Sequence, residues 1–115
     1  MSAPPFLVHE AIAFQLSSRL DDYGRDVGAM LLVPFDPDLY RRVTGHVDAM
    51  RLYAAELPSV SVAWTEVMIC HFELMHGLWR MAAREQPAQL DPLRSRLDAA
   101  SAHLAHRCLQ LMHAA

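Results

Sequence analysis

The residues of this chain that are best suited to catalysis or metal binding are its seven histidines: His9, His46, His71, His76, His103, His106 and His113. A neutral imidazole can ligate zinc, copper or nickel, and because it titrates near neutral pH it can also act as an acid or a base. Most of these histidines fall on the polar sides of the helices expected below. The ordinary interpretation of such a residue is a solvated surface side chain.

Glu73 and His76 form a Glu-x-x-His pair on the polar side of a helix. This spacing resembles one half of the ferritin-like di-iron motif, in which ligands three residues apart project into a bundle core. That family uses two such pairs and two further glutamates, so here a second copy of the chain at a dimer axis would have to supply the second pair. His103 and His106, also three apart, could join His76 across the bundle. We expect solvated polar pairs and no resident cofactor, with a divalent metal held by Glu73, His76, His103 and His106 as the alternative.

Arginine and histidine also recur at spacings of five to seven residues, in the pairs Arg41–His46, Arg96–His103 and Arg107–His113. These spacings are similar to the motif of HEPN domains, small dimeric helical bundles that often cleave RNA with Arg and His placed across the dimer. The resemblance implies a ribonuclease that uses Arg96 and His103. The polar residue typical after the Arg is present only at Arg42, and so many arginines and histidines also produce such spacings by chance.

His71 differs because it lies within the apolar side of its helix. Burying an imidazole without a partner costs a few kcal/mol, on the order of 2–7, so we expect a hydrogen bond to Tyr23, Tyr40, Tyr53 or a carboxylate of another helix. We expect the apolar side of this helix to pack in the core or at a subunit interface, with these residues: Trp64, Met68, His71, Met75 and Trp79.

The helix that carries these residues is predicted over residues 60–85, and it is apolar around most of its circumference. Such a helix should be buried on several sides, so we expect it at the centre of a bundle or of a dimer core. Apolar residues at helical spacing predict three further helices, over residues 6–32, 36–57 and 88–113. The short connections favour an up-down antiparallel four-helix bundle, and a three-helix variant with a broken first helix is the alternative.

Several residues mark the ends of these helices. Asp36, followed by Pro37, is a strong N-cap for the second helix, and Pro34 ends the first. Ser59 or Ser61 can cap the third, while the fourth can begin at Pro87 or Asp91. Two glycines inside the first helix, Gly24 and Gly28, predict either a kink or a close approach by another helix.

Composition narrows the class of protein. A chain of 115 residues suits one domain, and its 53% apolar content favours self-association, because a small monomer cannot bury so much apolar surface. The net charge of −3 and the absence of a basic stripe argue against nucleic acid as the main partner. Cys70 and Cys108 form no metal-binding spacing, which suits two free thiols in a reducing cytoplasm. No signal peptide and no membrane span are expected.

Taken together, these patterns predict an all-α four-helix bundle that associates as a homodimer. The function favoured by the sequence is a non-catalytic protein–protein interaction, adaptor or regulatory module. The seven methionines agree with this interpretation, because Met is over-used at surfaces that accept varied partners. They are also ordinary core residues. The metal-binding bundle and the HEPN-like ribonuclease remain the alternatives.

Overall fold

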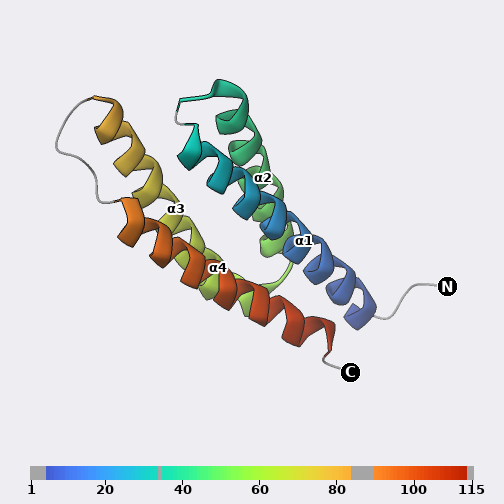
Figure 1. Ribbon diagram of the computed structural model, residues 1–115. Helices are drawn as coiled ribbons and strands as arrows, with labels where there is room; N and C mark the ends of the chain where they lie inside the picture. Colours follow the sequence, from blue (N-terminus) through green and yellow to red (C-terminus); the bar gives the residue numbers. More distant parts are fainter. Residues whose placement is uncertain (1–4, 34, 84–89, 114–115) are drawn as a thin grey trace.

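The computed structural model describes residues 5–33, 35–83 and 90–113, and within these ranges the fold is all-α. Four α-helices alternate in direction along the chain (Figure 1). They are α1 (Pro5–Leu32), α2 (Pro37–Ala55), α3 (Ser61–Ala82) and α4 (Leu90–Met112), with a short 3₁₀ turn, η1 (Pro58–Val60), before α3. The predicted all-α class is confirmed, and the up-down order of the helices agrees with a bundle. None of the described helices is both long and apolar enough to cross a membrane.

The start of α2 follows the predicted capping chemistry. Asp36 is the N-cap, and its carboxylate oxygen Oδ1 accepts hydrogen bonds from the backbone N–H groups of Asp38 (2.9 Å) and Leu39 (3.4 Å). Pro37 occupies the first helical turn, where its missing N–H costs nothing. The helix ends at Ala55, two residues before the predicted end at residue 57, and the chain then enters the turn that leads into η1.

The predicted serine cap of α3 is wrong. The N-cap position is Val60, and no side chain caps this helix. Instead, the 3₁₀ turn η1 precedes α3 directly, and the N–H of Val60 bonds to the carbonyl of Leu57 at 3.0 Å. The N–H of Ser61, the first residue of α3, bonds to the carbonyl of Pro58, so a backbone group of the turn satisfies it without a capping side chain. The predicted bounds at residues 84–85 and 88–89, the alternative start at Pro87 and the stop at Pro34 lie outside the described residues.

The two glycines do not break α1, which is one continuous helix from Pro5 to Leu32. A Cβ built on Gly24 would meet no atom within 4 Å, whereas one on Gly28 would lie 3.5 Å from the guanidinium of Arg94. The helix is therefore not broken at either glycine, and the contact that a Cβ on Gly28 would make with the Arg94 side chain of α4 is at an ordinary van der Waals distance.

The order of packing places α1 and α4 in the middle of the molecule. In Figure 1 the pair α1–α2 lies beside the pair α3–α4, and α1 packs along both α2 and α4 while α3 packs along α4. Contacts between α2 and α3 are sparse. The expectation that residues 60–85 form the centre of the bundle is therefore wrong for the single chain, because α3 has one extensive neighbour and α1 has two.

The core follows the predicted helical spacing in every helix. It contains the largest fully buried side chains of the described residues, including Leu16, Tyr23, Met50, Leu74, Leu97 and Leu104. Burial along α3 is restricted to one side of the helix, made mainly of Ala63, Val67, Cys70, His71, Leu74, Gly77 and Leu78. The other side of this apolar helix, with Val62, Ile69, Phe72 and Trp79, stays at the surface.

Candidate functional site

Three of the predicted site residues, Glu73, Arg96 and His103, take part in ion pairs that link α3 to α4. Arg96 binds Glu73 through two contacts, Nη1 to Oε2 at 2.7 Å and Nη2 to Oε1 at 3.1 Å. His103 lies 3.5 Å from a carboxylate oxygen of Glu66. Because both the acids and their partners are seven residues apart, the two contacts form successive rungs between antiparallel helices. Both contacts lie at the surface, where ion pairs add little to stability, and they link the exposed sides of α3 and α4.

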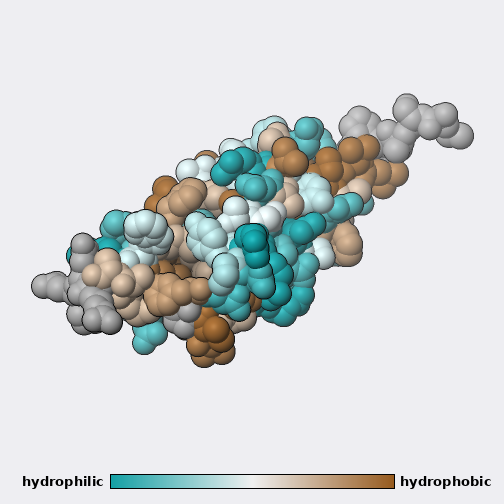
Figure 2. All heavy atoms as spheres, turned by 90° about the horizontal axis from the view of Figure 1, so that it is seen from above, coloured by the Kyte–Doolittle hydropathy of each residue, from teal (hydrophilic) through white to brown (hydrophobic). Residues whose placement is uncertain are grey.

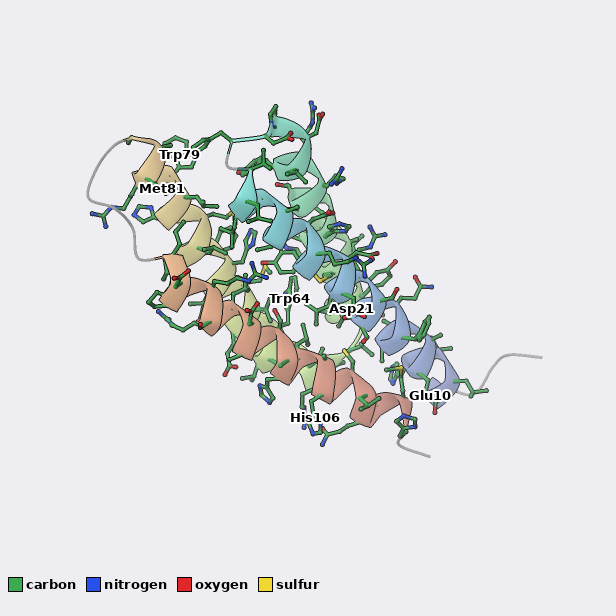
Figure 3. The ribbon with its side chains drawn as sticks, viewed as in Figure 1. Glu10, Asp21, Trp64, Trp79, Met81 and His106 are labelled. Atoms are coloured by element: carbon green, nitrogen blue, oxygen red, sulfur yellow. The ribbon has the colours of Figure 1, made fainter. Side chains whose placement is uncertain are left out.

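The predicted metal ligands do not converge in the single chain. Glu73 is bound to Arg96, whereas His76 and His106 are exposed. Figure 3 shows His106 on the lower half of α4, pointing away from the other helices. Across the residues that the structure describes, no three His, Cys, Asp or Glu side chains lie close enough to hold one metal ion.

The arginines of the predicted Arg–His pairs are each engaged by a neighbour. Arg96 is bound to Glu73, Arg41 pairs with Asp38 one turn earlier, and Arg107 donates to the carbonyl of Ser59 at 3.0 Å. Among the hydrogen bonds and ion pairs of the described residues, none joins one of these arginines to the histidine of its own pair. The partner of Arg41 lies on its own helix, that of Arg96 on α3 and that of Arg107 in the 3₁₀ turn η1, and the spacing alone does not predict these partners.

A polar network that the sequence reasoning missed joins α1 to α2. His46 Nε2 lies 2.7 Å from Asp26, whose other oxygen accepts from Arg42 at 3.2 Å, and Arg19 donates to His46 Nδ1 at 3.4 Å. The hydrogen bond from His46 lowers the pKa of Asp26 below its usual value, and Arg42 acts in the same direction, against the effect of burial. Both ring nitrogens of His46 are occupied, so we interpret this network as a structural clamp.

His71 has the buried hydrogen bond that the sequence required. The hydroxyl of Tyr23 lies 2.8 Å from His71 Nδ1, both side chains are buried, and their ring centroids are 5.6 Å apart. Burial lowers the pKa of His71 from 6.5 to about 4 and raises that of Tyr23 above its ordinary value. Both groups are therefore neutral at physiological pH, and the tautomer of His71 sets which of the two donates the hydrogen bond. Of the three tyrosines considered, Tyr23 is the partner.

The two cysteines are chemically quiet. Cys70 and Cys108 are buried and free. Burial raises the pKa of the Cys108 thiol to about 11, so it stays protonated and is a poor nucleophile. No redox or acyl-transfer site is indicated at either residue.

An apolar hollow lies where the start of α2 faces the end of α3. It is a groove of about 400 Å³. Its lining residues include Met30 of α1, Phe35 just before α2, Pro37 and Tyr40 of α2, and Met75, Leu78 and Trp79 of α3. Figure 3 shows Trp79 at the upper end of α3, by the connection between α1 and α2. Flexible methionines and exposed aromatics are typical of surfaces that bind apolar side chains.

Phe35, on the rim of this groove, has an unusual backbone. Its φ of 72° lies in the left-handed region, and it is the one described non-glycine residue with a positive φ. A bulky side chain in this region costs about 1–2 kcal/mol, and such outliers cluster at binding sites. The Phe35 ring is nevertheless 63% exposed, so folding of the single chain gains little from it.

The exposed side of α3 carries a row of large apolar residues, which we call the outer seam: Val62, Ile69, Phe72 and Trp79. These side chains are between 52% and 75% exposed. At about 100° per residue they lie on the side of the helix turned away from the buried Val67 and Leu74. Figure 2 shows that hydrophobic residues, in brown, form several patches among the hydrophilic ones on the face it presents. Of the residues predicted for a core or interface, His71 is buried, Trp64, Met68 and Met75 are half-buried, and Trp79 is exposed.

No family model matches this chain, and no curated protein or solved structure is significantly similar to it. The features of this chain that bear on function are therefore the outer seam, the groove, and the polar contacts between helices.

Proposed function

We propose that this chain is a non-catalytic protein-interaction module that acts as a homodimer. The observation that carries the proposal is the outer seam of α3, which leaves four large apolar side chains in water along a helix whose other side is buried. An apolar row on a folded helix is the usual mark of a contact with another chain. A second copy is the occupant we favour, because the same row on both copies gives a self-complementary contact across a two-fold axis.

The size of the seam suits a stable contact. Fully burying a large apolar side chain contributes about 1.5–3 kcal/mol. Because the four side chains are already partly covered, burying the rest on both copies would contribute on the order of 10 kcal/mol by that measure. Association of two chains costs upward of about 4 kcal/mol in lost motional freedom. The balance supports a dimer of moderate affinity, which suits an adaptor or regulatory module.

The groove beside the seam supplies a second contact surface, for an apolar segment of a different protein. Met30, Met75 and Trp79 offer adaptable apolar walls, and the strained backbone of Phe35 holds an aromatic ring at the rim. An amphipathic helix that lays its apolar side into such a groove is a common mode of protein recognition. The buried, free cysteines support a reducing compartment such as the cytoplasm.

The alternatives lack a comparable observation in their favour. A metal site would need Glu73 to leave a two-contact ion pair with Arg96, and a ribonuclease would need Arg96 itself to leave the same pair. Removing one partner from such a pair also leaves the other without its counter-charge. We therefore place both alternatives behind the interaction module.

The proposal is tested by the molar mass of the full chain in solution, measured by light scattering over a wide range of concentration. We expect the mass of a dimer at high concentration. Phe72→Glu, which puts a charge in the seam, should be monomeric. Leu52→Glu is the matched control, because Leu52 is also a large exposed apolar residue but lies on α2, and it should remain dimeric. A wild-type chain that is monomeric throughout, or a Phe72→Glu variant that dimerises as well as the control, would overturn the proposal.

A further inference from the structure

The apolar row on the exposed side of α3 contains one histidine. The members of the outer seam are seven, three and seven residues apart, and Thr65 and His76 occupy the exposed positions between them. Together these positions alternate by three and four residues, which is the spacing of the contact line between two paired helices. Histidine is the residue type that changes its charge between about pH 5 and pH 8. The row therefore holds a titratable group in the surface that we propose for the dimer.

The imidazole of His76 lies between two exposed aromatic residues. Phe72 is four residues before it and Trp79 is three residues after it, and side chains at these spacings are neighbours on the surface of a helix. Phe72 and Trp79 are 57% and 75% exposed. A second copy that covers both aromatic residues therefore also covers the imidazole between them. Because taking a charged group out of water costs far more than taking out a neutral one, such a contact favours the neutral form of His76.

The acidic residues on the flank of the seam toward α4 already have partners. Glu73, three residues before the imidazole, binds Arg96 through contacts of 2.7 and 3.1 Å, and Glu66 lies 3.5 Å from His103. Arg80, four residues after the imidazole, is a cation that also interacts within its own chain. A proton on the imidazole would therefore add positive charge near a cation, while the neighbouring carboxylates stay bound to other groups.

The groove side of the seam gives the same result. On α3 this side carries uncharged residues such as Met75, which lines the groove together with Trp79. The titratable residues that α2 and its N-cap add to the groove are Asp36, Tyr40 and Arg41. Asp36 caps α2 by accepting from two backbone N–H groups, and Arg41 is paired with Asp38. The acids on both flanks thus have roles within the chain, and protonation of the imidazole gains no new partner from them.

We propose that His76 makes the homodimer sensitive to acid, because the outer seam accepts the neutral imidazole and its protonation separates the two copies. This inference rests on the proposed homodimer and specifies how pH regulates it. Each copy contributes one His76, so the dimer excludes two protons that the separate copies bind in acid. This holds for parallel and antiparallel pairs of α3 alike. Where both protons are excluded, the dissociation constant rises by at most about a hundredfold for each pH unit of acidification.

The dissociation constant of the full chain, measured by sedimentation from about pH 8 to about pH 5.5, tests the inference. For the wild type we expect a rise of at least about tenfold and at most about a hundredfold over this range. His76→Leu keeps the seam apolar and should dimerise at least as tightly as the wild type at the upper pH, with a dissociation constant that stays nearly constant in acid. His76→Lys carries a charge throughout this range and should be as weak at the upper pH as the wild type is at the lower one.

His106→Leu is the matched control, because His106 is also exposed but lies on α4 and points away from the other helices (Figure 3). It should keep the pH dependence of the wild type, and circular dichroism at each pH checks that all four proteins stay folded. A wild-type dimer that does not weaken in acid, or that weakens no more than His76→Leu, overturns the inference and leaves the homodimer standing. So does a His76→Lys variant that dimerises as tightly as the wild type at the upper pH. A wild type that is monomeric at every pH overturns the homodimer as well.

Discussion

The burial of His71 predicts a specific dependence of stability on pH. His71 is buried at 6% exposure and its pKa falls from 6.5 to about 4 on folding. Between these values the unfolded chain binds a proton that the folded chain excludes, so the free energy of unfolding decreases as the pH falls from 6.5 toward 4. Each pH unit in this window costs at most about 1.4 kcal/mol, and the whole window costs on the order of 3 kcal/mol. Above pH 6.5 this contribution is fully present.

The variant His71→Gln isolates this contribution, because glutamine does not titrate and still offers an oxygen that can accept from Tyr23. The wild type should be the more stable protein at pH 7, and its advantage should shrink by about 3 kcal/mol when the pH is lowered to 4. Urea unfolding followed by circular dichroism at several pH values gives the two free energies. Loss of the Asp26 network in acid affects both proteins equally and cancels in the difference. A difference that stays constant from pH 7 to 4 would refute the argument that the fold excludes a proton from His71.

Two further predictions concern backbone positions. Gly24→Ala should raise the free energy of unfolding by about 0.5–1 kcal/mol, because Gly24 lies inside a helix with no atom within 4 Å of a new Cβ; a loss of stability in urea unfolding would show that another helix packs against it. Phe35→Gly should raise the free energy of unfolding by about 1 kcal/mol, since glycine tolerates the φ of 72°. Substitutions to or from glycine also change the conformational entropy of the unfolded chain. Phe35→Gly is therefore compared with Phe35→Ala, which keeps the backbone strain. A Phe35→Gly protein less stable than Phe35→Ala would refute the assignment of strain.

Much of the fold could be predicted from local pattern. Apolar residues at helical spacing predicted four helices and most of the buried residues, and Asp36 with Pro37 predicted the start of α2. These predictions succeed because helix formation and capping depend on residues within one or two turns. The prediction of a serine cap for α3 was wrong because a 3₁₀ turn precedes this helix and its backbone carbonyls accept the hydrogen bonds. Backbone groups are the same in every residue and so carry no sequence signal.

The choice of partners was decided by the tertiary structure. The need of His71 for a hydrogen bond followed from its apolar surroundings in the sequence, but Tyr23, which is 48 residues away, was one of several candidates until the helices were placed. The network of Asp26 and His46 had no local signal at all, because its members lie on two helices. Likewise, the sequence determined that α3 is apolar on most sides, whereas only the packing of α3 along α4 decided which side stays exposed. The physical reason is that periodicity specifies how much of a helix must be covered, and the arrangement of its neighbours specifies by what.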